Sequence, residues 1–238
     1  YPSLFKTIRK AYPDDYLCSC CNWDPINHGI IEHDLGVDMY TASNDDDLCG
    51  IIEDCIAKKP KFLFIQLDDV DGAGHGHGYG TQGHLDQIKK TDDYVGRICG
   101  AYEKAGIADD TLFVIIADHG GNDRGHGGYT VGEKFIYFAA AGKSVRKAEI
   151  SHLLTRDVNA VIRYAFGLEI PEYNAFGYSS QVPSEIFADY SGEYISARPV
   201  TYEIKNEATP DINGDDGLLS YFDSDDISIA LFFDNSEK

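Results

Sequence analysis

Carboxylate and imidazole side chains recur in three short segments of this sequence, and together they could bind metal ions. The first segment contains Asp71 and His75, the second contains Asp118 and His119, and the third contains His126. Two carboxylates and three imidazoles form a mixed oxygen and nitrogen ligand set, which suits zinc, with manganese or iron as alternatives. A lone histidine is usually an ordinary residue, but two Asp-plus-His groups followed by a third histidine are hard to obtain by accident. The set therefore predicts metal-dependent chemistry.

Glycines surround these candidate ligands, as in D-G-A-G-H at residues 71–75 and R-G-H-G-G at residues 124–128. Because glycine has no side chain, it lets the backbone turn tightly and brings ligands together. Arg124 can contact a phosphate oxygen, although a solvated loop charge is an equal alternative. His77 is an alternative ligand to His75 and ranks below it. The other histidines are interpreted as surface or structural residues: His28, His33, His84 and His152.

The candidate ligands follow apolar runs that predict buried strands. Residues 62–67 and 111–117 are almost continuously apolar, a pattern typical of strands covered on both faces. Apolar residues at helical spacing predict a long helix between them, after a glycine- and histidine-rich loop at residues 68–83. Alternating strands and helices predict an α/β domain with a mostly parallel sheet. In such sheets ligands bind at the carboxyl ends of strands, where these residues lie.

Three further elements are expected near the start of the chain. Ser3 can cap a short helix, and residues 16–21 form a plausible strand. Asp45 begins a run of three aspartates that places negative charge at the positive end of a second helix.

The six cysteines all lie within the first 99 residues. Cys18 and Cys20 are two apart on the expected strand and point the same way. Cys18 and Cys21 have the Cys-x-x-Cys spacing, but the sequence contains no second such pair, which argues against a structural zinc site. Buried free thiols are expected, with one disulfide left open.

The charge balance restricts the partners. There are 40 acidic and 20 basic side chains, a formal net charge of -20. Such a surface repels a nucleic-acid backbone, so no nucleic-acid surface is expected. An anionic substrate would need bound cations to approach. No stretch approaches the roughly 20 apolar residues of a membrane span.

The order of the three motifs resembles a known family. D-x-x-G-H at residues 71–75, D-H-G-G after a strand at residues 118–121, and G-H-G-G at residues 125–128 are similar to the type I phosphodiesterase/nucleotide pyrophosphatase branch of the alkaline phosphatase superfamily. The resemblance covers residues 1–186. It implies a three-layer α/β sandwich with a mostly parallel central sheet, and a two-metal hydrolase, with zinc expected, acting on a phosphate-ester small molecule or nucleotide.

The resemblance also implies roles for individual residues. Asp71, His75 and His126 correspond to the ligands of one zinc, and Asp118 and His119 to half the ligands of the other. In the family an aspartate after the first strand completes the second zinc, together with a nucleophilic threonine or serine.

The aspartate and the nucleophile lie upstream of the helix that begins near Ser3, so we expect them outside this chain. Thr7 and Thr41 are the nearest hydroxyls and are interpreted as helix-surface and loop residues. The expected function is a metal-dependent phosphodiesterase or phosphatase when complete. The alternative is an inactive structural or binding protein that keeps the fold.

The composition changes after Phe187. We expect a metal-hydrolase domain at residues 1–187 and an acidic, β-rich appendage, or the start of a further module, at residues 188–238. The stretch from Asp211 to Asp215 resembles the start of a calcium loop, with a plain acidic turn as the alternative. The acidic surface and tail favour an extracellular location. Tyr1 is not an initiator methionine, and we expect the natural chain to extend upstream.

Overall fold

A computed structural model describes residues 2–150, 153–170 and 186–187. The predicted appendage at 188–238 and the predicted calcium loop at Asp211 to Asp215 lie outside these residues. The chain forms two compact units. The first comprises Tyr1–Asp110 and Asp123–Gly125, and the second comprises Thr111–Asn122 and the residues from His126 onward. The predicted boundary at residue 187 stays a prediction.

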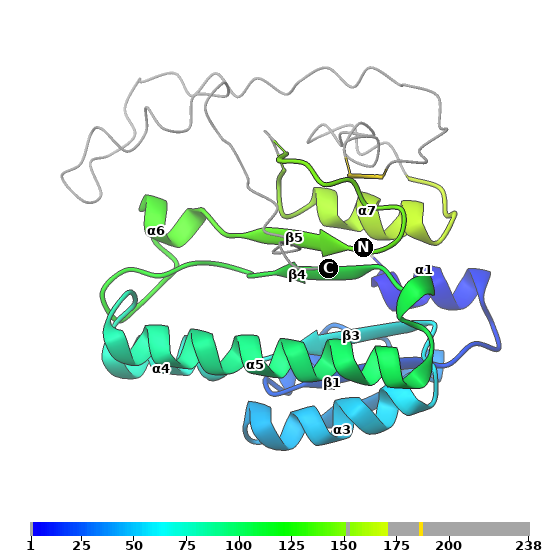
Figure 1. Cartoon of the computed structure of the whole chain (residues 1–238), viewed down its shortest axis with the longest axis horizontal. Helices are drawn as coiled ribbons and strands as arrows, with labels where there is room; N and C mark the ends of the chain where they lie inside the picture. The colour runs from blue at the N-terminus through cyan, green and yellow to red at the C-terminus, as the bar shows by residue number, and fades with distance from the viewer. Residues whose placement is uncertain (1, 151–152, 171–185, 188–238) are drawn as a thin grey trace. The chain divides into compact units, whose positions relative to one another are not determined.

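A parallel three-stranded sheet forms the centre of the first unit (Figure 1). Strand β1 (Leu17–Cys21) lies between β2 (Asp38–Thr41) and β3 (Phe62–Gln66) and pairs with both in parallel. All five residues of β1 are buried because helices cover both of its faces. The predicted α/β fold class with a parallel sheet is therefore confirmed.

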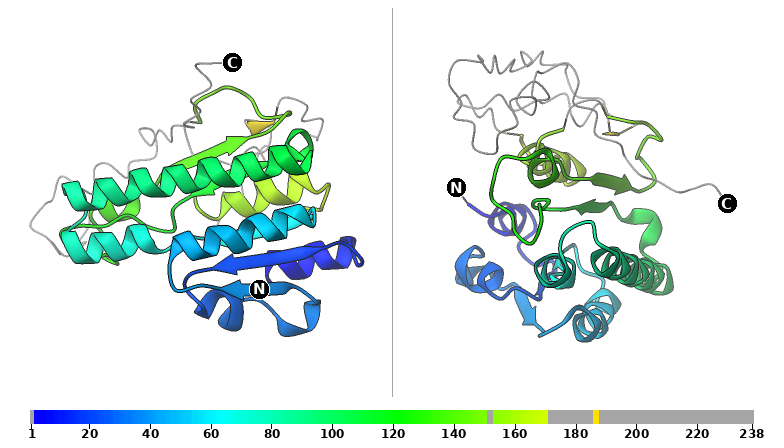
Figure 2. Two further views of the ribbon diagram at one scale, coloured as in Figure 1. Left: turned by 60° about the horizontal axis from the view of Figure 1, so that its bottom comes forward. Right: turned by 90° about the vertical axis from the view of Figure 1, so that its left-hand side faces the viewer.

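Contacts of successive β1 side chains show which helices cover the sheet. Cys18 and Cys20 contact Cys55 of α3 (Asp45–Ala57) on one face. Ser19 points to the opposite face, where its hydroxyl donates to Asn27 of α2 (Pro25–Gly29) at 2.6 Å. Helix α5 (Gln82–Ala105) packs beside α3, and the two views of Figure 2 show this pair side by side.

The remaining elements of the first unit are short. Helix α1 (Leu4–Ala11) begins at the predicted cap Ser3, whose side chain accepts a hydrogen bond from the Lys6 N–H. Phe5 of α1 packs edge-on against Phe62 of β3 with ring centroids 4.9 Å apart. Two 3-10 helices, η1 (His33–Leu35) and η2 (Ala108–Asp110), also belong to this unit.

The segment predicted as a glycine- and histidine-rich loop is instead largely helical, as α4 (Asp69–His77). Acidic Asp69 and Asp71 lie in its first turn, and His75 and His77 lie in its last turn. The two carboxylates in the first turn complement the positive end of the helix dipole and stabilise a helix despite its glycines. The loop prediction was wrong for these nine residues.

The second unit has its own small sheet and core. Strands β4 (Phe113–Ile116) and β5 (Phe138–Ala141) pair antiparallel, and β4 lies within the apolar run at residues 111–117. Helix α6 (Val131–Lys134) precedes β5, and α7 (Asp157–Ala165) packs against the sheet through Val161. The buried cluster consists of Phe138, Ala140, Ile150, Leu153, Val161, Ile186 and Phe187.

None of the helices formed by the described residues combines the length and the apolar character that a membrane crossing requires.

A buried carboxylate, Asp45, joins three elements of the first unit. It is fully buried at the start of α3 and accepts hydrogen bonds from the Asn22 amide at 2.9 Å and from the backbone N–H groups of Asp68 and Asp69 at 2.9 and 3.1 Å. Burial raises the pKa of Asp45, and these hydrogen bonds act in the opposite direction. Asp45 thereby fixes the point at which the chain leaves β3 and enters α4.

Replacing this carboxylate should destabilise the first unit. Asp45→Ala leaves two backbone N–H groups without their acceptor, and we expect a loss of about 3 kcal/mol in the free energy of unfolding. The matched control is Asp46→Ala, which removes only a largely exposed ion pair with Arg97 and should cost less than about 1 kcal/mol. Urea unfolding followed by circular dichroism measures both, and equal losses would contradict this role.

Candidate metal centre

Helix α4 places Asp71 and His75 on one face, because residues four apart are neighbours on a helix surface. Asp71 Oδ2 lies 3.3 Å from His75 Nε2. The other ring nitrogen, Nδ1, lies 2.8 Å from the carbonyl oxygen of Arg124. A carbonyl oxygen can only accept, so His75 Nδ1 carries the hydrogen of this bond. His75 therefore directs Nε2 toward the carboxylate.

The separation of these two atoms fits a shared cation. Tetrahedral zinc with ordinary Zn–N and Zn–O bonds places neighbouring ligand atoms about 3.4 Å apart. Metal-ligating histidines also commonly donate their second ring N–H to a backbone carbonyl, which fixes the tautomer.

The second unit repeats this arrangement after β4. His119 Nδ1 lies 3.0 Å from the carbonyl oxygen of Gly120, and His119 Nε2 lies 3.6 Å from Asp118 Oδ2. The His119 backbone N–H donates to Asp118 Oδ1 at 3.0 Å. The His126 ring stacks on His119 with centroids 3.8 Å apart. The second unit thus brings together Asp118, His119 and His126.

Asp118 is open to solvent, with 88% of its side chain exposed. Its charge also acts on Tyr137, since burial and then the Asp118 carboxylate raise the pKa of that tyrosine.

The glycine after His119 is required by close packing. A Cβ on Gly120 would lie 1.9 Å from the backbone oxygen of Gly132, a distance that no side chain can occupy. The Gly120 N–H also donates to the Glu133 carbonyl at 3.0 Å. The D-H-G spacing therefore holds the Asp118–His119 turn against the segment before β5.

Tyr79 is a site residue that the sequence did not reveal. Its hydroxyl donates to Asp71 Oδ1, and its ring lies edge-on to His75 with centroids 6.2 Å apart. Its backbone N–H donates to the Asp123 carbonyl at 2.7 Å. A Cβ on Gly74 would lie 2.5 Å from the Tyr79 ring, so this helical glycine makes room for the tyrosine. Tyr79 therefore orients the carboxylate of Asp71.

The side chains of His75 and His77, the two histidines at this end of α4, point to different places. His75, and not His77, faces Asp71, whereas the His77 ring packs over Gly83. Arg124 donates from Nη1 to the Gly76 carbonyl at 2.7 Å, which uses one of its five N–H donors. Its predicted contact with a phosphate stays a prediction.

The comparisons with known proteins bear on this arrangement. Residues 9–139 match the family model for type I phosphodiesterase / nucleotide pyrophosphatase, and this stretch includes every candidate ligand. At this level the match defines a domain of phosphoester hydrolases, a class that is typically metal-dependent. Because the match spans more than half of the chain, the protein belongs to the type I phosphodiesterase/nucleotide pyrophosphatase family. A search of curated proteins gave no match.

The hydroxyl of Tyr79 provides a direct test of the α4 site. Tyr79→Phe removes the hydrogen bond to Asp71 while keeping the ring beside His75, and we expect about 10-fold weaker zinc binding. Tyr94→Phe is the matched control, since Tyr94 lies on α5 and its buried hydroxyl makes no hydrogen bond among the described residues. Competition titration with a chromophoric chelator measures both variants. Equal affinities would show that the Tyr79 hydroxyl does not position Asp71.

Proposed function

We propose that this protein hydrolyses phosphate esters with two divalent cations, zinc by preference. Asp71, His75 and His126 would hold one cation, and Asp118 and His119 would contribute to the other. The observation that carries the proposal is the repeated arrangement in the two units: a histidine whose Nδ1 bonds a backbone carbonyl and whose Nε2 faces a carboxylate oxygen. One such pair is common on protein surfaces, but two within the matched motifs favour ligand pairs.

Chain connectivity supports the inclusion of His126 with the α4 pair. His75 bonds the carbonyl of Arg124, and only Gly125 separates Arg124 from His126. Two peptide links span at most about 7.6 Å between Cα atoms. This short link to Arg124 supports the proposal that His126 shares a cation with His75.

Charge explains why cations would be needed. The chain carries a formal net charge of -20, which opposes the approach of an anionic phosphate ester or nucleotide. Divalent cations supply local positive charge and polarise phosphoryl oxygens. The protein's own contribution is to keep both imidazoles in the Nδ1–H tautomer and to present Asp118 to solvent. Arg124 retains donors that can bind a phosphate oxygen.

The attacking group remains a separate proposal. The resemblance implies a threonine or serine hydroxyl from a segment outside these 238 residues. In the first unit, the Thr41 hydroxyl at the end of β2 donates to Asp24 at 2.7 Å, and the Thr7 hydroxyl bonds the Ser3 carbonyl within α1. These contacts agree with reading both as structural residues. The extracellular location also remains a prediction.

Loss of either histidine should remove metal and activity together. His75→Ala and His119→Ala should each lower bound zinc by about one ion per chain, measured by atomic emission after dialysis. Hydrolysis of a nitrophenyl phosphate diester by the full-length gene product should fall at least about 100-fold. His33→Ala is the matched control and should change neither quantity. His33 lies in η1, outside the three motifs, and its ring stacks on that of His28.

The same measurements distinguish a hydrolase from an inactive binding protein that keeps the fold. Zinc bound in both sites without hydrolysis by the full-length gene product would favour a binding protein that keeps the fold. Less than about 0.2 zinc per chain, far below the stoichiometry of a real site, would sink the proposal.

A further inference from the structure

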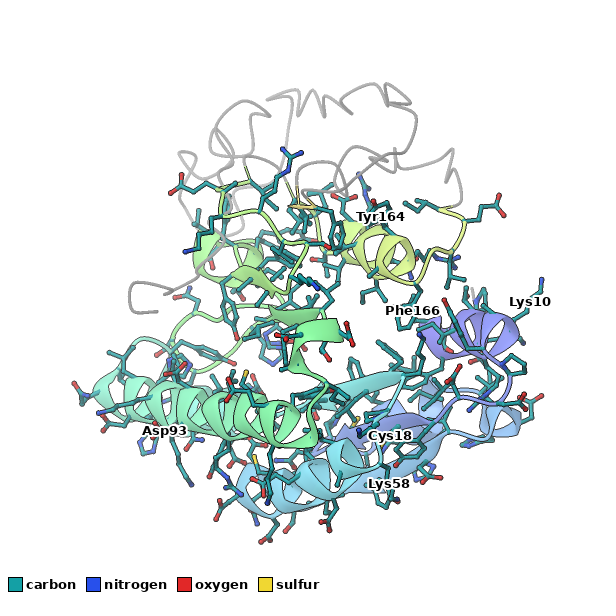
Figure 3. The ribbon with its side chains drawn as sticks, turned by 45° about the vertical axis from the view of Figure 1, so that its right-hand side comes forward. Lys10, Cys18, Lys58, Asp93, Tyr164 and Phe166 are labelled. Carbon is teal, nitrogen blue, oxygen red and sulfur yellow. The ribbon has the colours of Figure 1, made fainter. Side chains whose placement is uncertain are left out.

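Three cysteines of the first unit converge on one point inside the protein. Cys18 and Cys20 lie on β1 and Cys55 lies on α3, and each is at most 1% exposed. Cys55 Sγ lies 3.1 Å from Cys18 Sγ and 3.8 Å from Cys20 Sγ, and the two strand sulfurs are 3.7 Å apart. All three are free thiols. Figure 3 labels Cys18 within the first unit.

These distances match a sulfur coordination sphere. Zinc–sulfur bonds of ordinary length in a tetrahedral site place neighbouring sulfurs about 3.8 Å apart. Two of the three separations have this value, and the third would need to open by roughly 0.7 Å to reach the same spacing. Thiolates are soft ligands that select Cu(I) and zinc over the harder cations that carboxylates prefer.

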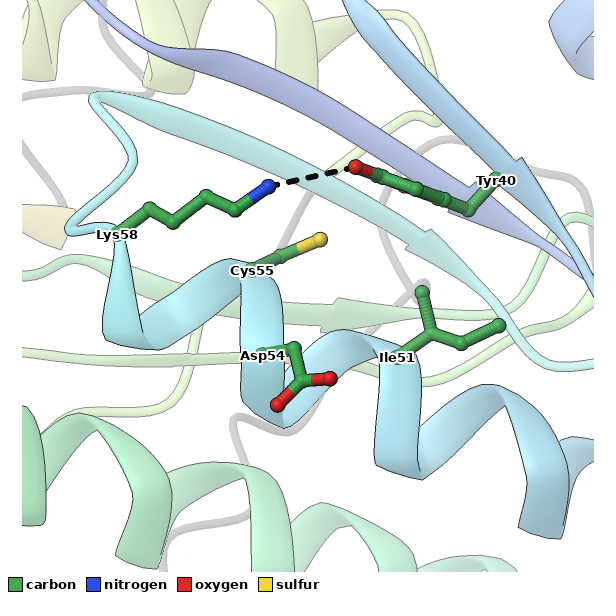
Figure 4. Close-up of a pocket in the computed structure, with 5 residues that line it drawn as sticks. All are labelled: Tyr40, Ile51, Asp54, Cys55 and Lys58. Carbon is green, nitrogen blue, oxygen red and sulfur yellow. Dashed lines mark hydrogen bonds between the residues drawn. The ribbon is translucent and has the colours of Figure 1, made fainter.

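A pocket lies beside one cysteine of the cluster, Cys55. Its volume is about 450 Å³ and it is lined by Tyr40, Ile51, Asp54, Cys55 and Lys58 (Figure 4). Lys58 donates to the Tyr40 hydroxyl at 3.3 Å. Cys55 thus lines the pocket while its sulfur contacts the two strand cysteines.

The polar surroundings suit a sulfur site that binds a cation. The Cys18 and Cys20 thiols, which donate to Cys55 Sγ, lower the pKa of Cys55, and Lys58 acts in the same direction. The buried Tyr16 hydroxyl lies beside Cys18 and Cys55. The Lys58 ammonium and the Tyr16 hydroxyl thus place further polar groups near the three sulfurs.

We propose that Cys18, Cys20 and Cys55 form a three-sulfur site for a thiophilic cation, with Cu(I) bound more tightly than zinc. A three-coordinate sulfur set satisfies Cu(I), whereas zinc takes four ligands. None of these cysteines belongs to the candidate hydrolase ligands, so the proposal is independent of the hydrolytic function. The buried cysteine Cys49 on α3 has no place in the cluster and offers a matched control.

Anaerobic titration of the reduced protein with Cu(I), in competition with a chromophoric chelator, tests the site. We expect one tightly bound Cu(I) per chain, and Cys18→Ser and Cys55→Ser should weaken binding at least about 100-fold, as expected for loss of a direct ligand. Cys49→Ser and His75→Ala should bind as the wild type does. Unchanged affinity in the Cys18→Ser and Cys55→Ser variants would overturn the proposal.

A second measurement needs no variant and covers the case in which serine replacements fail to fold. X-ray absorption of the wild-type protein loaded with one equivalent of Cu(I) should show three sulfur neighbours. A first shell of nitrogen and oxygen, or recovery of a Cys18–Cys55 disulfide in place of bound metal, would also overturn the proposal.

Discussion

The hydrogen bond between His75 Nδ1 and the Arg124 carbonyl is the constraint on which the candidate centre depends. It fixes the tautomer of His75, and it holds a distant segment of the chain at the end of α4. Two further hydrogen bonds join the same segments, from Arg124 to the Gly76 carbonyl and from the Tyr79 N–H to the Asp123 carbonyl. Because the chain leaves the first unit at Thr111 and rejoins it at Asp123, these bonds determine where it leaves again toward His126.

The position of α4 itself is set from its other end. Asp45 holds the backbone N–H groups of Asp68 and Asp69, and Asp69 in return accepts from the Asp45 N–H at 3.3 Å. The α4 segment therefore starts at a buried anchor and ends at the His75–Arg124 bond. A helix tied at both ends presents Asp71 and His75 with little freedom, which is the preorganisation that a metal site requires.

Sequence reasoning succeeded where the pattern was local and failed where the outcome depended on partners distant in the chain. The apolar runs predicted the strands that became β3 and β4, and the three motifs predicted the family. The segment of α4 contains three glycines, each costing a helix about 1 kcal/mol relative to alanine, so its sequence resembles a loop. The buried anchor at Asp45 offsets this cost, and a hydrogen bond to a residue 24 positions away has no sequence signature.

The same limit explains why the sequence did not reveal the roles of Tyr79 and Cys55. The chain has 16 tyrosines, and nothing in the spacing distinguishes the one that bonds Asp71. Cys18 and Cys20 were expected to share a face of β1, but Cys55 joins them only because α3 packs on that face. Helix packing cannot be deduced from cysteine spacing alone, so the three-sulfur cluster became visible only in the structure.

The candidate hydrolase centre and the three-sulfur site differ in ligand chemistry and in exposure. Both differences affect which cations each would bind. Carboxylates and imidazoles near the surface, as at Asp118 and His119, would allow an anionic ester to approach any ions bound there. Thiols buried between β1 and α3 exclude a substrate of that size and prefer softer ions. A chain with both sets could therefore hold a thiophilic ion in its interior while leaving the oxygen and nitrogen ligands to the ions that act on phosphate esters.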